Sequence, residues 1–259
     1  MKILVLPDIH GRDFWRKPCE NIDKYDKVVF LGDYLDPYDF EEISVETAID
    51  TFKDILRFAK DNPKVVILLG NHDCPYFSPT YYGFSSYHCR HSRQFHDTIS
   101  GIFKEHEDQF KIAHSEGNIL FTHAGCVSHW LSFAFGEKYD DEIELNELCD
   151  GLNSLTKDAS GLNRLYMISS IRGGYDPFGS CLWADRSELY WDTTAILNEE
   201  ARQYAIFKVN QVFGHTLQAF YDKNGDVKFG DCSEFRNCKM LDNAHAYELD
   251  TETFTIKQL

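Results

Sequence analysis

The segment Val65-Val66-Ile67-Leu68-Leu69-Gly70-Asn71-His72-Asp73 places an apolar run directly before a polar turn. Such a run, rich in β-branched residues and bounded by glycine, is typical of a β-strand that is buried on both faces. In an open α/β sheet, ligands bind in the crevice beyond the carboxyl ends of the strands. Asn71 and His72 are therefore expected at the edge of a sheet where a functional site can form.

The same arrangement occurs four more times, each time with a carboxylate or imidazole side chain after an apolar run. The runs and their polar residues are Lys2–Leu6 before Asp8 and His10, Lys27–Leu31 before Asp33 and Asp36, Asn118–Phe121 before His123, and Gln211–Phe213 before His215. Five turns at the carboxyl ends of strands can converge although they are far apart in sequence. Carboxylate, imidazole and amide ligands together suit Mn, Fe or Zn better than Ca, which prefers oxygen alone.

Together these blocks resemble the calcineurin-like metallophosphoesterases, whose motifs are D-x-H, G-D-x-x-D, G-N-H-[DE], H-[AG]-G and G-H-[TS]. All five motifs occur in order between residues 8 and 216. The chain is most similar to the branch of the phosphoprotein phosphatases and the symmetrical dinucleoside tetraphosphatase. Gly11 follows the first motif as in that branch, and Leu217 stands where many phosphodiesterases have a second histidine. Residues 179–186 are similar to the Leu-Trp segment of the same branch.

This resemblance implies an α/β fold, arranged as a four-layer α/β/β/α sandwich with two mixed sheets. The metal site is expected at the carboxyl ends of the strands. Residues 1–259 are predicted to form a single metallophosphoesterase domain, with cap-like insertions near residues 74–112 and 126–180.

The resemblance also implies a centre of two divalent or trivalent metal ions, with Mn favoured and Fe or Zn as alternatives. A metal-bridging hydroxide would attack phosphorus, His72 would protonate the leaving group, and Asp36 would orient His72. Asp33 is expected to bridge both ions. The full set of implied metal ligands is Asp8, His10, Asp33, Asn71, His123 and His215.

One position departs from the family pattern, and it concerns phosphate binding. Phosphoprotein phosphatases have an arginine after the second aspartate of G-D-x-x-D, where this chain has Pro37. Proline cannot reproduce the bidentate phosphate contact of a guanidinium group. Arg186 is the first candidate to replace that arginine, and Arg172 and Arg12 are weaker ones, while Asn71 would also help hold the phosphate. Pairing of Arg186 with Asp185 or Glu188 on the surface is an equally good interpretation.

The leading prediction is a serine/threonine-type phosphomonoesterase that acts on a phosphorylated protein or a small phosphoester. Hydrolysis of a dinucleoside polyphosphate or another nucleotide is the alternative. A phosphodiesterase is less favoured because of Leu217. A non-catalytic metal-binding scaffold is also less favoured, since His72 and the bridging ligand are intact.

Composition limits the remaining possibilities. The chain has 259 residues, a net charge of −16 and eight irregularly spaced cysteines. Irregular spacing in a chain of this size indicates reduced thiols and a cytoplasmic protein. The negative charge disfavours nucleic acid and anionic membranes as partners. No apolar run reaches the roughly 18 residues of a transmembrane helix, and a cleaved signal peptide would remove Asp8 and His10.

Periodicity predicts the main elements between the blocks. Helices are expected over residues 12–26 and 42–61, and a third helix should carry Phe95, Ile99, Ile102 and Phe103. The first sheet should be largely parallel because strands and helices alternate. Later segments are expected to form a second, more antiparallel sheet: residues 211–213, 219–222, 227–229, 239–241, 246–249 and 254–256.

Overall fold

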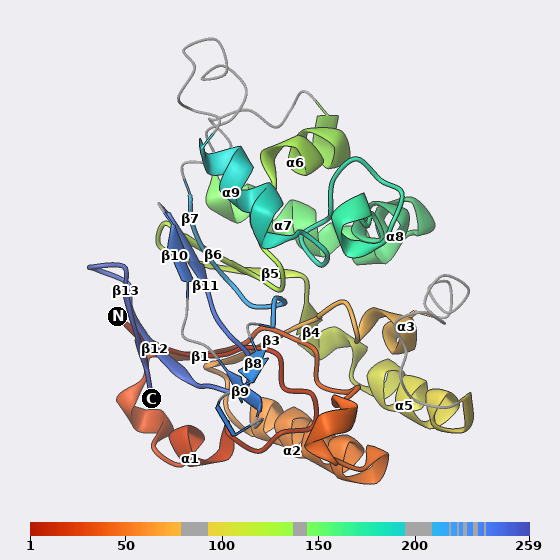
Figure 1. The fold of residues 1–259 in the computed structure, drawn as a ribbon, viewed down its shortest axis with the longest axis vertical. Coiled ribbons are helices and arrows are strands. Elements are labelled where there is room, and N and C mark those ends of the chain that lie inside the picture. Colours follow the sequence, from red (N-terminus) through yellow and green to blue (C-terminus); the bar gives the residue numbers. More distant parts are fainter. Residues whose placement is uncertain are drawn as a thin grey trace. The chain divides into compact units, whose positions relative to one another are not determined.

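The computed structural model describes residues 1–78, 93–136, 144–194, 209–217, 219–221, 223–224, 227–229, 233–235 and 237–259. The chain divides into two units, one made of residues 1–111 and 243–259 and the other of residues 112–242. Each unit contains a mixed sheet with helices (Figure 1). The predicted α/β class with two mixed sheets is therefore confirmed, while the single domain with cap-like insertions stays a prediction.

The sheet of the first unit has six strands in the order β13-β12-β1-β2-β3-β4. Strands β1 to β4 pair in parallel, and β12 pairs antiparallel with both β1 and β13. The parallel part matches the prediction from the strand–helix alternation. The strand bounds are β1 Lys2–Leu6, β2 Lys27–Phe30, β3 Val65–Leu68, β4 Phe110–Lys111, β12 Tyr247–Asp250 and β13 Thr255–Gln258.

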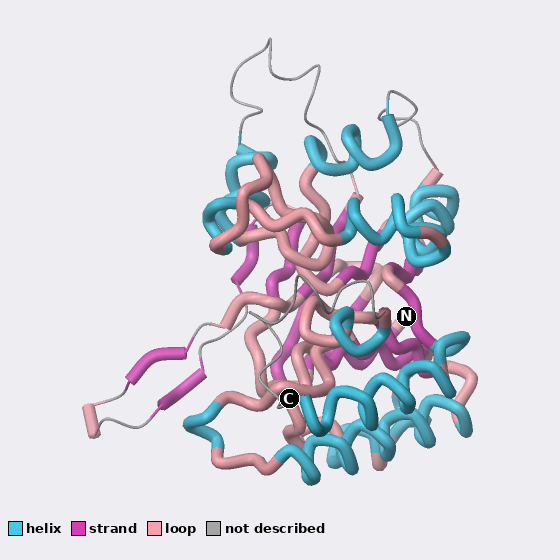
Figure 2. Tube along the Cα trace, turned by 90° about the vertical axis from the view of Figure 1, so that its right-hand side faces the viewer, coloured by secondary structure: helices cyan, strands magenta, loops and turns pink. Residues whose placement is uncertain are grey.

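The helices of this unit lie mainly on one face of its sheet (Figures 1 and 2). The longest, α2, begins one residue after Ser44, whose hydroxyl accepts a hydrogen bond from the Thr47 N–H at 3.1 Å and caps the helix. Its predicted start at residue 42 was therefore three residues early. The bounds are α1 Arg16–Cys19, η1 Ile22–Lys24, η2 Asp39–Glu41, α2 Val45–Asp61, α3 Cys74–Phe77, α5 Arg93–Glu105 and η3 Glu107–Gln109.

The continuous helix predicted over residues 12–26 was wrong. The segment instead forms the single turn of α1 and the short 3₁₀ helix η1. Pro18 lies within this turn and has no N–H to donate, which weakens a longer helix. The strand β2 nevertheless begins at the expected place.

An aromatic cluster forms the core between α2, α5 and the sheet. The ring of Phe52 lies 5.1 Å from Tyr34 and 4.7 Å from Phe103, measured between centroids. Phe103 in turn lies 5.0 Å from Phe110. Phe52 thus connects the helices to the segment that follows β2, and Tyr34 stands directly after Asp33 in the chain.

The second unit contains a five-stranded sheet in the order β10-β11-β7-β6-β5 and a separate two-stranded sheet of β8 and β9. Helices α6 to α9 lie on one face of the larger sheet (Figure 1). The strand bounds are β5 Ala113–Glu116, β6 Ile119–Thr122, β7 Asn210–Phe213, β8 Ala219–Tyr221, β9 Val227–Phe229, β10 Ser233–Phe235 and β11 Cys238–Met240. The helix bounds are α6 Ser128–Phe135, α7 Leu145–Ser154, η5 Leu155–Lys157, α8 Ala159–Leu165, η6 Ser170–Arg172 and α9 Arg186–Thr194.

Two expectations about the later strands are corrected. Strands β12 and β13 belong to the first sheet, because β12 pairs with β1 rather than with the strands that precede it. Strands β8 and β9 also lie outside the second sheet, since they form a two-stranded sheet of their own. The second sheet has antiparallel pairs at both edges and parallel pairs between β7 and its neighbours β6 and β11, so it is more antiparallel than the first, as expected. Within the described residues, no helix is both long and apolar enough to cross a membrane.

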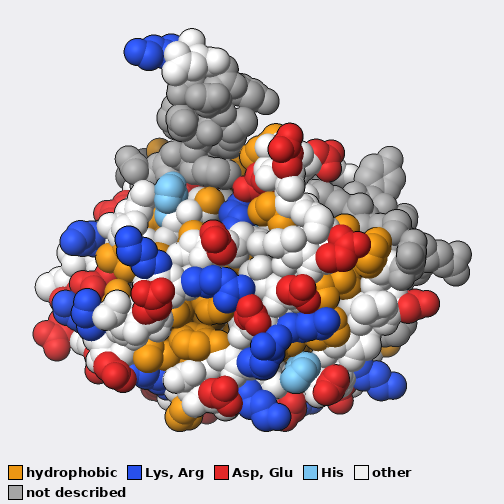
Figure 3. All heavy atoms as spheres, turned by 90° about the horizontal axis from the view of Figure 1, so that it is seen from below, with side chains coloured by type: hydrophobic (Ala, Val, Ile, Leu, Met, Phe, Trp, Pro, Cys, Tyr) orange, Lys and Arg blue, Asp and Glu red, His pale blue; other side chains and the backbone are white. Residues whose placement is uncertain are grey.

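The surface seen in Figure 3 carries acidic and basic side chains interspersed with apolar ones. Charged side chains on the surface of the first unit also form pairs: Asp54 of α2 lies 2.6 Å from Arg16 and 3.2 Å from Arg57. Such exposed pairs contribute roughly 0–1 kcal/mol each. The fold therefore depends on its apolar and aromatic core rather than on surface charge.

We expect Phe52→Ala to lower the free energy of unfolding by about 3–5 kcal/mol, because it leaves a cavity among Tyr34, Phe103 and Phe110. Urea denaturation followed by circular dichroism measures this loss. Phe40→Ala is the matched control, since the Phe40 side chain is exposed, and its effect should stay within about 0.5 kcal/mol. Equal losses in the two variants would contradict the assignment of Phe52 to the core.

Candidate active site

Three turns of the first unit follow the neighbouring parallel strands β1, β2 and β3, as the sequence predicted. Asp8 and His10 follow β1, Asp33 follows β2, and Asn71 follows β3. The backbone N–H of His10 donates a 2.6 Å hydrogen bond to the Asp33 carbonyl oxygen. The turns after β1 and β2 are thus joined directly through residues that the sequence singled out.

The backbone at these positions has an uncommon conformation. Within the described parts of the chain, eight residues other than glycine have positive φ, and five of them are predicted site residues. The five are Asp8 (38°), His10 (47°), Asp33 (54°), Asp36 (58°) and His215 (70°). Aspartate and histidine tolerate this left-handed region better than most residues, yet each such position costs on the order of 1–3 kcal/mol. Because five of the eight left-handed residues are predicted site residues, this strained backbone conformation is associated with the candidate site.

Gly70 makes room for the Asp33 carboxylate. A Cβ added at Gly70 would lie 2.1 Å from Asp33 Oδ1 and 2.5 Å from the Asp33 backbone nitrogen. Those distances are far inside van der Waals contact, so any other residue at this position would displace Asp33. The glycine before Asn71 is therefore required by the close approach of a neighbouring turn.

Four carboxylates of this unit are buried in the turns that follow β1, β2 and β3. Asp8, Asp33, Asp36 and Asp73 have side chains that are at most 2% exposed. Burying ionised carboxylates is unfavourable unless hydrogen bonds, opposite charges or metal ions offset the loss of hydration. A cation binding site is the arrangement that such a group of acids favours.

His10 fits the role of a metal ligand. Its Nδ1 lies 2.7 Å from the Leu35 carbonyl oxygen, which can only accept, so Nδ1 carries the proton. In the neutral ring, Nε2 then has a lone pair, and it lies 3.5 Å from Asp33 Oδ2. Ligand atoms of Asp8, His10 and Asp33 all lie within 4.8 Å of one another. Two facing acceptors with a fixed imidazole tautomer suit a metal ion between them.

Asp73 is a functional residue for which sequence reasoning assigned no role, although its motif position was visible. Its carboxylate accepts hydrogen bonds from the backbone N–H groups of Asp33 (2.7 Å), Gly70 (2.8 Å) and Tyr34 (3.0 Å). Burial, followed by the nearby Asp33 carboxylate, raises the pKa of Asp73 well above its ordinary value, while these N–H groups act in the opposite direction. Asp73 therefore ties the turn after β3 to the turn that presents Asp33.

His72 and Asp36 form the predicted pair. His72 Nδ1 lies 3.0 Å from Asp36 Oδ2, and the His72 backbone N–H donates to Asp33 Oδ1 at 2.9 Å. The His72 ring also lies edge-on to the His10 ring, with 5.3 Å between the centroids. Because Asp36 occupies Nδ1, the Nε2 atom of His72 is the one that can act on a substrate.

In the second unit, His123 follows β6 and His215 follows β7, two strands that pair in parallel. The Gly214 N–H donates to the His123 carbonyl oxygen at 2.8 Å, and His123 Nε2 lies 3.1 Å from His215 Nδ1. Two imidazole nitrogens at this distance can share a proton or face one cation. The Trp183 ring packs edge-on to His215 at 6.0 Å, which places the Leu-Trp segment beside this pair.

The three candidate arginines differ in their surroundings. Arg172 Nε lies 2.8 Å from Asp185 Oδ2, and its Nη2 donates to the Thr216 hydroxyl at 2.5 Å, so it is held beside the turn of His215. Although burial alone would raise the pKa of Asp185, hydrogen bonds from Ser187 and the charge of Arg172 lower it.

Arg186 is exposed at the first residue of α9. Arg12 is buried against Glu41, with Nε at 2.5 Å from Oε1, and donates to the Asp8 carbonyl oxygen at 2.9 Å. Arg12 therefore supports the turn that carries Asp8.

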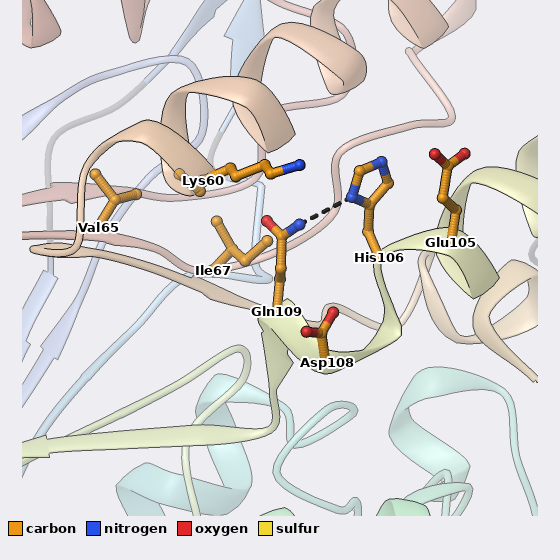
Figure 4. Close-up of a pocket in the computed structure, with 8 residues that line it drawn as sticks. Lys60, Val65, Ile67, Glu105, His106, Asp108 and Gln109 are labelled. Carbon is orange, nitrogen blue, oxygen red and sulfur yellow. Dashed lines mark hydrogen bonds between the residues drawn. The ribbon is translucent and has the colours of Figure 1, made fainter.

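A separate pocket of about 410 Å³ lies elsewhere in the first unit (Figure 4). Val65 and Ile67 of β3 line it together with His106 and Gln109, whose Nδ1 and Nε2 atoms lie 2.8 Å apart. The pocket shares no residue with the predicted ligands or the His72–Asp36 pair. It is therefore not part of the candidate site.

Comparison with protein families shows which family has this arrangement of residues. The model of the calcineurin-like phosphoesterases matches residues 1–218. The chain belongs to the calcineurin-like phosphoesterase family. Its members use divalent metals in a dinuclear site, and the candidate ligand group of Asp8, His10 and Asp33 fits that chemistry. Membership implies a phosphoester hydrolase.

Solved structures with the same fold include phosphatases. A cold-active protein tyrosine phosphatase, determined at 1.1 Å, matches with a TM-score of 0.56 and 16% identity over 100% of this chain and 78% of that chain. The cold-active protein-tyrosine phosphatase of a psychrophilic Shewanella species matches with a TM-score of 0.54 and 18% identity, over 100% and 80% of the two chains. At these identities the likeness shows the fold alone. A search of curated proteins found no match.

We expect Asp73→Asn to lower both stability and metal affinity, because an amide nitrogen cannot accept from the N–H groups that the carboxylate now holds. The unfolding free energy should fall by about 1–3 kcal/mol. Metal affinity should fall by roughly 10- to 100-fold, the usual effect of losing a group that orients a ligand. Thermal denaturation and calorimetric titration with Mn²⁺ measure the two effects. Asp97→Asn, at an exposed aspartate, is the control, and wild-type values for Asp73→Asn would contradict its role.

Proposed function

We propose that this protein is a metal-dependent phosphomonoesterase that removes phosphate from phosphoserine or phosphothreonine in proteins. The observation that supports the proposal most is the His72–Asp36 pair. The turn of Asp36 also carries Asp33, and the His72 ring lies beside His10, so the pair adjoins the candidate ligand group of Asp8, His10 and Asp33. A metal ligand set with an adjacent, carboxylate-oriented imidazole is suited to hydrolysis in which the leaving group needs a proton. Family membership supports the phosphoester chemistry.

We further propose that both ligand sets serve one dinuclear centre. Asp8, His10, Asp33 and Asn71 would supply ligands from the first unit, and His123 and His215 from the second, as the family motifs imply. Bound ions would lower the pKa of water and neutralise phosphate charge. Mn is the proposed metal, with Fe or Zn as alternatives that the mixed donor set also accommodates.

His72 is proposed to act as the general acid. Its Nδ1 faces the Asp36 carboxylate, which stabilises the protonated ring and fixes its orientation. Its Nε2 can then donate a proton to the oxygen that leaves with the serine or threonine side chain. No covalent phosphoenzyme intermediate is required, since water supplies the new oxygen of the phosphate.

Arg172 is proposed to bind the phosphate in place of the arginine that Pro37 replaces. Asp185 and Thr216 hold its guanidinium, so less side-chain freedom is lost when a phosphate binds. Arg186, the first candidate from sequence, is exposed and would have to be ordered by the substrate. Asn71 would contribute a second polar contact to the phosphate oxygens.

The remaining predictions concern substrate and compartment. Buried thiols at Cys19, Cys74 and Cys126 support a reducing, cytoplasmic environment. A phosphorylated protein or a small phosphoester remains the proposed partner. Binding to nucleic acid or to a membrane is disfavoured by the net charge of −16.

Turnover of a defined substrate panel tests the proposed function. The panel contains a phosphothreonine peptide, a phosphotyrosine peptide, diadenosine tetraphosphate and bis-p-nitrophenyl phosphate. Each substrate is measured with Mn²⁺ and again with excess chelator. We expect chelator-sensitive hydrolysis with the highest kcat/KM for the phosphothreonine peptide.

The other results would each contradict part of the proposal. Preference for diadenosine tetraphosphate would establish a nucleotide hydrolase, and preference for the bis-ester would establish a phosphodiesterase. Preference for the phosphotyrosine peptide would support a phosphomonoesterase but would contradict its proposed specificity for phosphoserine and phosphothreonine. No turnover by protein shown to hold its metals would overturn the catalytic function.

We expect His72→Asn to slow turnover of substrates with poor leaving groups by about 10²–10⁴-fold, because these reactions depend on the general acid. Metal content should stay at the wild-type level, since His72 lies beside the ligands without being one of them. Steady-state kinetics and elemental analysis of the same sample measure both. Unchanged kcat would remove His72 from the proposed role.

We expect Arg172→Ala to reduce kcat/KM for phosphomonoesters by about 10- to 150-fold, the kinetic equivalent of losing roughly 1.5–3 kcal/mol of charge-assisted hydrogen bonding. Arg186→Ala is the matched control at a residue only 14 positions away in the printed chain. We expect it to change kcat/KM by less than about threefold. The reverse ranking of the two variants would assign phosphate binding to Arg186.

A further inference from the structure

Both oxygens of the Asp36 carboxylate are contacted by side chains from one short segment. His72 approaches Oδ2 at 3.0 Å, and the Tyr76 hydroxyl donates to Oδ1 at 2.8 Å. Asp36 itself is fully buried and has a left-handed backbone with a φ of 58°. Two contacts on opposite oxygens fix the carboxylate plane, not only its position.

The position of Tyr76 is set by its surroundings rather than by Asp36 alone. Tyr76 lies in the single turn of α3, where its backbone N–H donates to the Asp73 carbonyl oxygen at 3.0 Å. Its ring packs 5.4 Å from His96 and stacks at 6.4 Å with Phe103, both on α5. His96 Nε2 also lies 3.1 Å from the Pro75 carbonyl oxygen. Contacts from helix α5 to the Tyr76 ring and to Pro75 thus fix the position of the Tyr76 hydroxyl.

A hydrogen bond to a buried carboxylate is stronger than one between neutral groups. It favours a single orientation of Asp36 in which Oδ2 stays directed at His72 Nδ1. Without it, the carboxylate can rotate about its Cβ–Cγ bond, and the imidazole loses its fixed orientation. Tyr76 would therefore affect a substrate only indirectly, by orienting Asp36, which in turn orients His72.

We propose that Tyr76 is a positioning residue for proton donation, acting on His72 through Asp36. This inference rests on the proposed function, in which His72 is the general acid. It adds a third member, supplied by α3 and supported by α5, to the His72–Asp36 pair. Tyr76 does not contact the reacting atoms in this role.

Tyr34 provides a matched comparison within the same unit. Its side chain is also buried, and its hydroxyl donates a 2.8 Å hydrogen bond, but to the backbone carbonyl oxygen of Leu68. Substituting phenylalanine at either position removes one hydroxyl and one hydrogen bond of equal length. Tyr34→Phe should lose less stability than Tyr76→Phe, because its hydrogen bond is to a neutral carbonyl rather than to a carboxylate, and it should leave the orientation of Asp36 unchanged.

The test uses the 259-residue chain loaded with Mn²⁺ and a series of aryl phosphates whose leaving groups range from p-nitrophenol to phenol. For Tyr76→Phe we expect kcat on phenyl phosphate to fall about 10- to 100-fold, as is usual when a group that orients a functional side chain is lost. The decrease on p-nitrophenyl phosphate should be much smaller, because that leaving group needs little protonation. KM and metal content should stay close to wild type. For Tyr34→Phe the dependence on the leaving group should be unchanged.

The double variant Tyr76→Phe/His72→Asn separates positioning from a general structural effect. If Tyr76 acts through His72, the double variant should be no slower than His72→Asn alone. Additive losses, or an equal loss on every aryl phosphate, would overturn the inference, as would wild-type kinetics for Tyr76→Phe. Failure of the proposed function is distinguishable, since it would appear as absent turnover in the wild-type protein or wild-type kinetics for His72→Asn.

Discussion

The burial of four carboxylates beyond the carboxyl ends of neighbouring parallel strands is the constraint on which the rest of the site depends. Asp8, Asp33, Asp36 and Asp73 are all removed from water, so their charges must be offset locally. The four carboxylates are stabilised in three different ways. Asp73 accepts three backbone N–H groups, Asp36 receives His72 and Tyr76, and Asp8 and Asp33 face His10 in the candidate ligand group. This division of roles is what makes a cation site and a proton donor possible side by side.

The backbone around these acids is built to allow such close approach. Parallel pairing of β1, β2 and β3 brings their carboxyl-terminal turns together. In these turns Asp8, His10, Asp33 and Asp36 have a left-handed backbone. Gly70 admits the Asp33 carboxylate, and the aromatic core around Phe52 supports the segment that carries it. The unfavourable backbone conformations are tolerated because the packed strands and helices on either side hold them in place.

Sequence reasoning was accurate where the signal was local or where the family motifs implied a role. Each apolar run before a polar turn became a strand ending at a predicted ligand, and the His72–Asp36 pair was found in the expected geometry. It was inaccurate where pairing is non-local: nothing in residues 247–250 shows that they pair with β1. Tyr76 and Asp73 received no role, because their partners lie about 40 residues away on another turn and, unlike for His72 and Asp36, no role implied by the family resemblance linked them. The arginine that binds phosphate was also ranked without knowing that Asp185 and Thr216 hold Arg172.

The most direct test of the account is the number of metal ions bound per chain, measured by elemental analysis after loading with Mn²⁺ and removal of free metal. The account predicts two ions for the wild-type protein. It predicts loss of both ions, or a large decrease in their affinity, for Asp33→Asn, because that carboxylate is assigned to both ions. Two tightly held ions in Asp33→Asn, or none in the folded wild-type protein, would contradict the dinuclear centre.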